Sequence, residues 1–181
     1  MPLVARAFAE LGYRRTTTAE LARRCRVQEN ILYRLWPDKK AMFVAAIDYV
    51  YELSIEIWSG LAAEGETEGS AAARLLRYEA RHHGEFGLYR ILFAGLNELD
   101  DREIHAALKR VYGRFHDFIE CQIEACAGKG RATPVDSELA AWAFIGLGTA
   151  ANIGRELRLL NGDARERFIR LVGEVLLGGT P

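Results

Sequence analysis

The residues of this chain whose types could do chemistry are basic side chains, which suit contacts with acidic partners and gather near its start. Residues 1–40 hold nine Lys and Arg side chains against four acidic ones, a net charge of +5. The other 141 residues hold 15 basic and 21 acidic side chains, a net charge of −6. A basic head on an acidic body is typical of a DNA-binding protein with a separate second domain. Charge alone favours an ordinary solvated surface, and the motif within this segment reverses that preference.

The same sequence gives no support for covalent catalysis. Its Ser, His and acidic residues are too dispersed to suggest a triad, and no Gly-rich phosphate loop follows a strand. His82, His105 and His116 lack metal-ligand spacing, and Cys121 and Cys126 would point to different sides of a helix. We therefore expect no enzyme activity, no metal and no cofactor. Three scattered cysteines fit a reducing cytoplasm rather than a disulfide framework.

The segment 12–43 predicts two short helices joined by a tight turn, which would position the basic residues. Thr17 begins a capping box with Glu20 and so starts the first short helix. Residues 26–27 form the turn, and the second short helix runs over residues 28–35. The residues expected to face inward are Leu21, Ala22, Cys25, Val27, Leu32 and Leu35. Such a pair with a small buried set is a helix-turn-helix.

Flanking helices complete this head. A first helix over residues 3–11 is expected to pack on the pair with its apolar face, which makes a three-helix unit. Trp36 ends the second short helix, because the residue before a proline resists the α conformation. Asp38 then caps a long helix that runs to about Leu61. The first turn of that helix belongs to the head and its last turns to the body, so we expect it to link the two mechanically.

This segment resembles the DNA-binding domain of the TetR (tetracycline-repressor-like) family of transcriptional regulators. The residues that carry the resemblance, at the family's spacing, are Gly12, Tyr13, Thr16, Thr17, Leu21, Ala22, Val27, Leu32, Tyr33, Trp36, Pro37, Lys39 and Phe43. Three positions depart from the usual pattern: Arg26 replaces the turn glycine, Gln28 replaces the common serine cap, and Glu29 stands where a basic or neutral residue is commoner. These departures bear on the operator sequence and the turn geometry rather than on the fold.

The resemblance implies a DNA-binding role for the second short helix, whose first residues enter the major groove in this motif. The residues that would face base edges or the adjoining backbone are Gln28, Glu29, Asn30, Ile31 and Arg34. Tyr33 resembles the family's phosphate-binding tyrosine, and Thr17 and Lys39 lie at helix starts, which favour phosphate. Alternatives stay open: Thr17 as a simple cap, Tyr33 or Ile31 as core residues, and Glu29 as a partner of cytosine or as an acid that repels phosphate. Further phosphate neighbours are Arg14, Arg15 and Lys40.

The rest of the chain predicts a helical body. Its expected helices cover residues 71–83, 88–97, 102–126, 136–160 and a last segment capped by Asp163, with loops at 63–70 and 128–134. No strand alternation and no internal repeat appears in the sequence. The expected fold class is all-α, with about nine helices: a helix-turn-helix head in residues 1–43 and a ligand-binding and dimerisation body in residues 44–181.

The family resemblance also implies a small-molecule pocket inside this body. The aromatic and histidine candidates to line it are Trp58, His82, Phe86, Tyr89, Phe93, Tyr112, Phe115, His116 and Trp142. Ordinary core packing is the alternative for each of them.

The last two helices are expected to form the dimer contact as a four-helix bundle across a two-fold axis. The residues assigned to it are Trp142, Gly146, Ala150, Ile153, Leu157, Phe168, Leu171, Val172 and Val175. The alternative is that these helices close the monomer's own core.

Two functions compete on this sequence. The first is a ligand-responsive repressor that binds a palindromic DNA operator as a homodimer and is released by a small molecule bound in the body. The second is a helical ligand-binding or scaffold module that has lost specific DNA reading. It is motivated by Arg26, by Glu29 and by the few residues before Leu3, where related proteins carry a basic arm. No signal peptide opens the sequence, and its longest uncharged stretch, residues 139–154, is too short for a membrane span, so we expect a cytoplasmic protein without a membrane partner.

Overall fold

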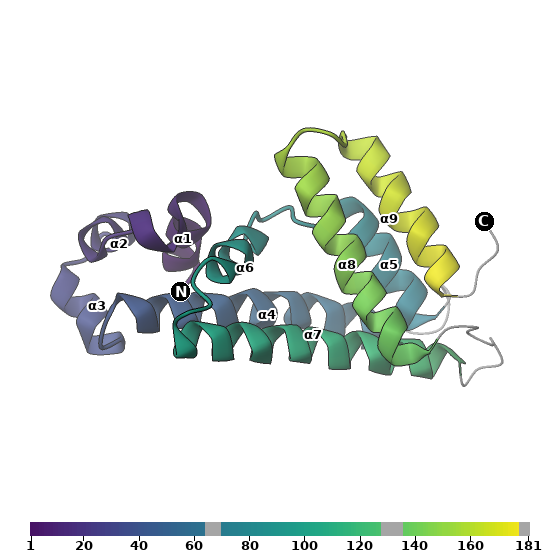
Figure 1. Cartoon of the computed structure of the whole chain (residues 1–181), viewed down its shortest axis with the longest axis horizontal. Helices are drawn as coiled ribbons and strands as arrows, with labels where there is room; N and C mark the ends of the chain where they lie inside the picture. Colours follow the sequence, from purple (N-terminus) through teal and green to yellow (C-terminus); the bar gives the residue numbers. More distant parts are fainter. Residues whose placement is uncertain (64–69, 128–135, 178–181) are drawn as a thin grey trace. The chain divides into compact units, whose positions relative to one another are not determined.

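The computed structural model describes residues 1–63, 70–127 and 136–177, which form nine α-helices and no strand (Figure 1). The helices are α1 (Pro2–Arg15), α2 (Thr18–Cys25), α3 (Glu29–Leu35), α4 (Lys39–Ala63), α5 (Ala71–His82), α6 (Tyr89–Leu96), α7 (Arg102–Ala127), α8 (Ser137–Glu156) and α9 (Gly162–Leu176). The expected all-α fold class is confirmed. The two expected loops fall almost entirely outside the described residues.

The chain divides into two compact units, and the division falls inside α4 and α7. The first unit comprises Met1–Ser54 and Phe86–Tyr112, and the second comprises Ile55–Glu85 and Gly113–Pro181. The head helices α1 to α3 thus share their unit with α6 and with the first parts of α4 and α7. The expected functional boundary at residues 43 and 44 stays a prediction.

Aromatic residues from α1 and α4 form the core of the first unit. Phe8 and Phe43 are fully buried and meet edge to face, with ring centroids 4.9 Å apart. Tyr13 lies against Phe43 at 4.8 Å. Helix α1 kinks at Gly12, whose φ is +74°, and then continues to Arg15. Tyr13 reaches Phe43 because of this continuation. The first helix is therefore longer than the sequence predicts.

The turn between α2 and α3 is formed by Arg26 in the left-handed conformation, with φ 56° and ψ 42°. The next N–H, of Val27, donates to the carbonyl of Ala22 at 3.0 Å and closes the end of α2. Glycine is the residue that usually takes this place, because it has no Cβ to clash with the backbone. The expected turn at residues 26–27 is confirmed, and Arg26 adopts the glycine conformation.

Three expectations about inward residues and helix ends were wrong. Val27 does not face inward, because it lies in the turn and is 39% exposed. Leu35 does not face inward either: 66% of it is exposed, whereas Leu32 is 3% exposed. The reason is that α3 is only seven residues long, under two turns, so its last residue lies beyond the contact with α2. The cap of α9 is Asn161, whose side chain accepts from the N–H of Ala164 at 2.8 Å, and not Asp163.

Helices α5, α8 and α9 pack together in the second unit. Their shared core contains Leu76, Ala80, Leu147, Ala151 and Ile169. Gly173 allows α9 to approach α5 closely, because a Cβ at this position would lie 2.3 Å from a methyl carbon of Leu76. Gly146 differs, since nothing lies within 4 Å of the Cβ it lacks. One face of α8 is therefore packed and another is open.

Replacing Arg26 by glycine is expected to stabilise the protein. Arg26→Gly should raise the free energy of unfolding by about 0.5–1 kcal/mol, since glycine adopts a positive φ without steric cost. Urea unfolding followed by circular dichroism measures the change. Ala19→Gly, at an exposed helical position of α2, is the control and should lower stability by about 0.5–1 kcal/mol. Equal losses in both variants would contradict a strained turn.

Candidate nucleic-acid interface

Helix α3 is attached to the head by one buried side chain and presents the others to solvent. Leu32 is the buried residue of α3, and the N-cap residue Gln28 makes no side-chain cap hydrogen bond. The exposed residues are Gln28, Glu29, Asn30, Ile31, Tyr33 and Arg34. Ile31 is 37% exposed and Tyr33 is 47% exposed, so neither is a core residue. The structure thus brings all six residues expected to face DNA from this helix onto an accessible surface.

A small polar cluster ties α3 to the start of α2. The hydroxyl of Thr18 donates to the Glu29 carboxylate at 2.6 Å, and the Tyr33 hydroxyl donates to Thr18 Oγ1 at 3.3 Å. Sequence reasoning missed Thr18, although its place beside the capping Thr17 was a usable signal. Glu29 is thereby held toward α2, where its charge is satisfied by a hydrogen bond.

Thr17 and Lys39 occupy the helix starts that the sequence assigns to phosphate. Thr17 Oγ1 accepts from the N–H of Glu20 at 3.2 Å, which confirms its role as a cap. A hydroxyl that accepts still has its own proton to donate. Lys39 Nζ donates to the carbonyl of Tyr13 at 3.1 Å and lies 4.4 Å above the Tyr13 ring. An ammonium group has two more N–H donors for a phosphate.

Two further basic residues of the head are paired with acids of the α6–α7 connection and of the first turn of α7. Arg14 bonds Glu98 at 2.7 Å. Lys40 bonds Glu103 at 2.6 Å and Asp101 at 3.4 Å. All five residues belong to the first unit. Phosphate contact by Arg14 or Lys40 would therefore compete with these acids.

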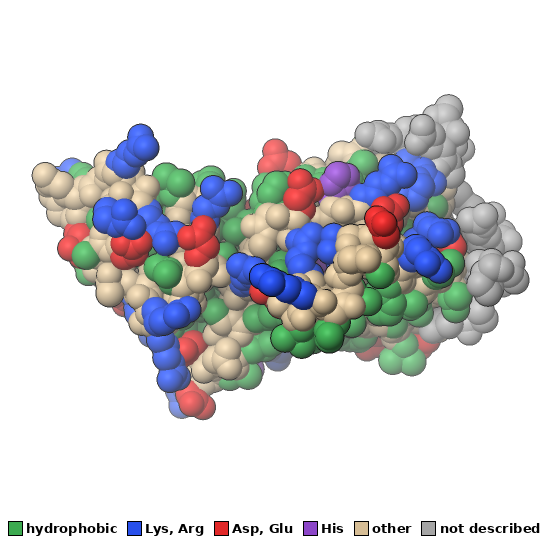
Figure 2. All heavy atoms as spheres, turned by 90° about the horizontal axis from the view of Figure 1, so that it is seen from above, with side chains coloured by type: hydrophobic (Ala, Val, Ile, Leu, Met, Phe, Trp, Pro, Cys, Tyr) green, Lys and Arg blue, Asp and Glu red, His purple; other side chains and the backbone are tan. Residues whose placement is uncertain are grey.

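Glu20 is the centre of an ion-pair network on α2. Its carboxylate accepts from Arg23 at 2.8 Å and from Arg24 at 2.7 Å, and Arg24 also bonds Glu10. These hydrogen bonds lower the pKa of Glu20 from 4.5 to about 2. Figure 2 shows acidic and basic side chains interspersed over the N-terminal helices on the face that it draws. Glu20 binds the arginines instead of reaching back to Thr17, so only half of the expected capping box forms.

In the second unit, Trp58 joins an aromatic cluster to a polar network. Its ring lies 5.5 Å from that of Phe115 and 5.6 Å from that of Phe118. Its Nε1–H donates to Glu79 Oε1 at 2.7 Å. Two of the expected ligand-lining residues, Trp58 and Phe115, are therefore in contact.

The network continues from Glu79 into α8. Glu79 Oε2 lies 2.6 Å from His83 Nδ1, and His83 Nε2 lies 3.0 Å from the carbonyl of Gly148 and 3.1 Å from Asn152 Nδ2. Asn152 is 4% exposed, and its Oδ1 is buried without a hydrogen-bond partner among the described residues. Exchanging the amide O and N would leave a donor unpaired instead. A buried polar atom of this kind costs about 1–3 kcal/mol, which a ligand group could recover.

The expected histidines of the second unit lie in two different settings. His82 is exposed, stacks on Tyr78 at 4.6 Å and pairs with Glu85. His116 is buried and lies 5.1 Å from the ring of Trp142. His83, which the sequence analysis did not select, is the histidine of the Glu79 network. Only one of two adjacent helical residues can face inward, and periodicity alone does not say which.

The remaining ligand candidates belong to the first unit. Tyr89 and Phe93 meet edge to face at 5.6 Å, and Phe86 is 58% exposed. Burial raises the pKa of Tyr112. The assignment of all nine residues to a ligand pocket stays a prediction.

Helices α8 and α9 expose an apolar face. The exposed members of the expected dimer contact are Trp142, Gly146, Ala150, Ile153, Leu157, Leu171, Val172 and Val175, while Phe168 is partly buried. Leu157 is the most exposed of them, at 64%. The buried residues Leu147, Ala151 and Ile169 lie on other faces of the same helices.

The site therefore belongs to a helix-turn-helix head on a helical body, and known proteins share both parts. Residues 5–46 match the family model described as bacterial regulatory proteins, tetR family. A solved regulator of the TetR family from Rhodococcus sp. has a TM-score of 0.79 at 16% identity, with 97% of each chain covered. The resemblance to the TetR family is thus confirmed: the head matches its model and the chain has its fold.

Two other known proteins are also similar. AibR, solved in complex with isovaleryl coenzyme A and operator DNA, has a TM-score of 0.70 at 18% identity, covering 99% of this chain and 96% of its own. The nucleoid occlusion factor SlmA of Aliivibrio fischeri (strain MJ11) is 27% identical over 156 residues, 79% of this chain and 76% of its own.

In the part of the chain that the structure describes, no helix has the length and apolar character needed to cross a bilayer.

The low pKa of Glu20 predicts a specific pH dependence of stability. The folded value of about 2 lies below the ordinary 4.5, so the contribution of Glu20 is complete above pH 4.5 and is lost as the pH falls toward 2. Glu20→Gln should therefore be less stable than the wild type at pH 7, with the gap closing by pH 2.5. Urea unfolding at pH 7, 4 and 2.5 measures it. Arg23→Gln should weaken the same pH dependence, and parallel curves for wild type and Glu20→Gln would contradict the network.

Proposed function

We propose that the protein is a ligand-responsive transcriptional regulator that represses by binding a palindromic operator as a homodimer. The single observation that carries this proposal is the surface of α3, where Leu32 is buried and six polar, aromatic and aliphatic residues are exposed. A helix presented in this way, in a head that matches the tetR model, fits the major groove by its first residues.

The exposed side chains supply complementary contacts to a duplex. The Asn30 amide can form two hydrogen bonds with an adenine edge, and the Arg34 guanidinium can form two with a guanine edge. Ile31 offers an apolar contact to a thymine methyl group. Tyr33, Thr17 and Lys39 would hold the phosphates on either side. The complex of AibR with operator DNA supports this use of the fold.

A symmetric dimer would place two such helices on one face of DNA. The apolar face of α8 and α9 supports this, because side chains such as Ile153 and Leu157 are exposed in the isolated chain. Small residues on the same face, Gly146 and Ala150, would allow two copies of α8 to approach closely. Two heads must stand about 34–36 Å apart to reach successive major grooves.

A small molecule in the body would release the DNA if it binds one arrangement of the heads more tightly than the other. The Trp58–Glu79–His83–Asn152 network offers aromatic surface and one unpaired amide atom for such a molecule. In the first unit, the Arg14–Glu98 and Lys40–Glu103 pairs join the head to the α6–α7 connection. Helices α4 and α7 each contribute to both units, which gives the body a covalent path to the head.

The second candidate is a helical module that does not read a specific DNA sequence. The pairing of Arg14, Arg23, Arg24 and Lys40 with acids favours it, as does the position of Glu29 on α3. The relative SlmA, named a nucleoid occlusion factor, gives a reason to test DNA binding before transcription.

Selection of bound sequences from random duplexes separates the two candidates. The full chain is expected to enrich a palindrome, and its affinity should fall steeply with salt. Arg34→Ala should weaken binding to the selected sequence by roughly 1–3 kcal/mol and relax base preference. Tyr33→Phe and Lys39→Ala should weaken binding to all sequences alike. Fluorescence anisotropy measures the affinities.

The control for these variants is Arg170→Ala on α9, where Arg170 is exposed and pairs with Glu174 at 3.4 Å. It removes the same charge and should leave DNA affinity within twofold of the wild type. Enrichment of no motif by a protein with intact circular dichroism would favour the second candidate. Unchanged affinity in both Tyr33→Phe and Lys39→Ala would show that the phosphate assignments are wrong.

Introducing a charge on α8 is expected to separate the dimer without unfolding the chain. Ala150→Arg places a guanidinium on the exposed apolar face, where a dimer would bury it. Sedimentation analysis should find a dimer for the wild type and a monomer for Ala150→Arg, with DNA affinity reduced to that of a half-site. Ala106→Arg, at an exposed alanine of α7, should remain dimeric. A wild-type chain that is a monomer would contradict the proposed assembly.

A further inference from the structure

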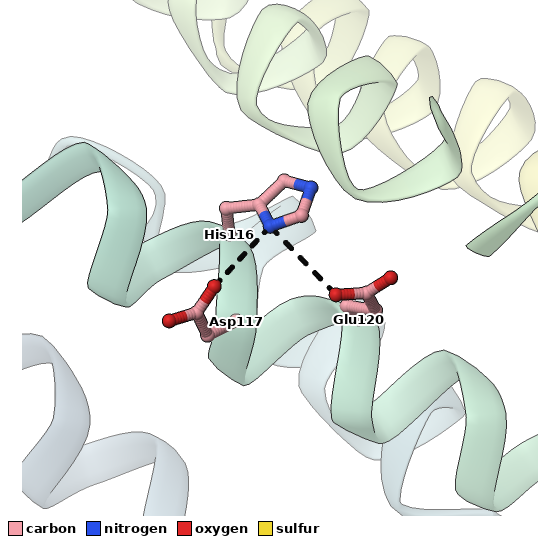
Figure 3. A group of neighbouring side chains, drawn as sticks. All are labelled: His116, Asp117 and Glu120. Atoms are coloured by element: carbon pink, nitrogen blue, oxygen red, sulfur yellow. Dashed lines mark hydrogen bonds and ion pairs between the residues drawn. The ribbon is translucent and has the colours of Figure 1, made fainter. Parts of the chain in front are cut away.

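Helix α7 brings three potential metal ligands together at His116, Asp117 and Glu120 (Figure 3). His116 Nδ1 lies 3.5 Å from Asp117 Oδ1 and 3.9 Å from Glu120 Oε2. One ligating atom from each residue lies within 4.8 Å of the others. Neither the DNA-binding head nor the Glu79 network uses these residues. They form a separate group in the second unit.

The ring of His116 is fixed with one nitrogen facing the carboxylates. The residue is 8% exposed, and its Nε2 lies 3.1 Å from the carbonyl oxygen of Glu138. A carbonyl oxygen only accepts, so Nε2 carries a proton, and a neutral ring then has its lone pair on Nδ1. Metal-binding histidines commonly donate their second nitrogen to a backbone carbonyl in this way. Trp142 packs on the ring and holds its plane.

Both carboxylates can complete the site. The Ser137 hydroxyl lies 3.3 Å from Glu120 Oε1 and 3.3 Å from Glu124 Oε1, so it shares one proton between them, while Glu120 Oε2, the oxygen nearest His116, is left to bind an ion. The side chain of Asp117 is 80% exposed and can rotate to close on an ion. Ligands of a tetrahedral zinc ion lie about 3.4 Å apart, given bonds of about 2.0–2.1 Å. The distance from His116 to Asp117 is 3.5 Å and that to Glu120 is 3.9 Å, and rotation of the exposed Asp117 side chain would bring all three ligand atoms, now within 4.8 Å of one another, closer to this spacing.

We propose that His116, Asp117 and Glu120 form a binding site for one divalent transition-metal ion of the zinc class. Two carboxylates that face Nδ1 are satisfied either by a proton on that nitrogen, as an ion pair, or by a metal ion that replaces the proton and binds all three groups. The imidazole ligand selects zinc, cobalt or nickel over magnesium and calcium, which prefer oxygen ligands alone. Water would fill the remaining position on the exposed side. Cys/His spacing does not reveal this site, because one histidine and two acids on a single helix carry no such signature.

An ion here would join α7 to the start of α8. Two of its ligands already bond the first residues of α8, since His116 contacts the Glu138 carbonyl and Glu120 contacts the Ser137 hydroxyl. Binding of the ion only to the folded chain would raise thermal stability by mass action. The site does not depend on the proposed repressor function, and DNA binding is not needed to detect it.

The test titrates zinc into the chelator-treated, untagged full chain by calorimetry. One ion is expected per chain, with a rise in melting temperature, and magnesium and calcium should not replace it. Asp117→Asn and Glu120→Gln should each weaken zinc binding at least tenfold. Zinc should also shift the ¹⁵N resonance of His116 Nδ1 in the wild type, which identifies the histidine without replacing a buried residue.

Two control variants remove similar groups from the same helix. Glu103→Gln takes away one exposed carboxylate in the first turn of α7, away from the site, and His105→Gln takes away an exposed histidine. Both should bind zinc within about threefold of the wild type. Zinc affinity that is unchanged in Asp117→Asn and Glu120→Gln, or that is lost equally in the controls, would overturn the site. So would equal binding of magnesium, or the absence of zinc binding by the folded wild type.

Discussion

The exposed surface of α3 depends on the burial of one side chain, Leu32. Burying a leucine contributes about 1.5–3 kcal/mol, which is a large part of what a seven-residue helix can gain from packing. The left-handed turn at Arg26 sets the direction in which α3 leaves α2. The Thr18 hydrogen bonds to Glu29 and Tyr33 then fix its rotation. Since isolated helices of this length are unstable in water, these three constraints hold α3 in place.

The charge of the head acts at two distances. Ion pairs such as Glu20 with Arg23 and Arg24 neutralise charges locally, yet the net +5 of residues 1–40 is unchanged by pairing. At separations up to the Debye length of about 8–10 Å a duplex responds to the net charge of the head, whereas contact with a phosphate requires a free donor. The whole head can therefore attract DNA, while α3 and the helix starts make the contacts.

Local rules of sequence were sufficient for the parts of the fold that depend on neighbouring residues. Thr17 and Asp38 cap their helices as expected, because a cap needs only a polar side chain and the next turn. At the start of α9 two polar residues stand close together, and local rules do not choose between Asn161 and Asp163. The prediction that Leu35 faces inward was wrong for another reason. Periodicity assigns a residue to a face of its helix but does not say where the facing helix ends.

The candidate sites of the body were harder to predict, because their decisive partners are backbone atoms far along the chain. His83 meets the carbonyl of Gly148, and His116 meets that of Glu138. A carbonyl group is present at every residue and leaves no mark in the sequence. The inward histidine of the pair 82–83 was therefore decided by tertiary structure alone.

The second unit uses buried polar side chains to fix helices relative to one another. Arg74, 7% exposed on α5, donates to the carbonyls of Leu61 and Ala62 at the end of α4. A cation at this place also favours the negative end of the α4 dipole. His83 and His116 make the corresponding links from α5 and α7 to α8.

Each of these hydrogen bonds is directional, and breaking one without a new partner for its polar groups costs free energy. An effector can therefore open this body most easily where a polar group is already unpaired, and among the described residues Asn152 Oδ1 is such a group. A molecule that bonds Asn152 beside Trp58 and His83 gains a hydrogen bond without breaking one. The Glu79 network therefore holds one unsatisfied polar atom that a bound molecule could pair, whereas the His116 group links α7 to α8 separately.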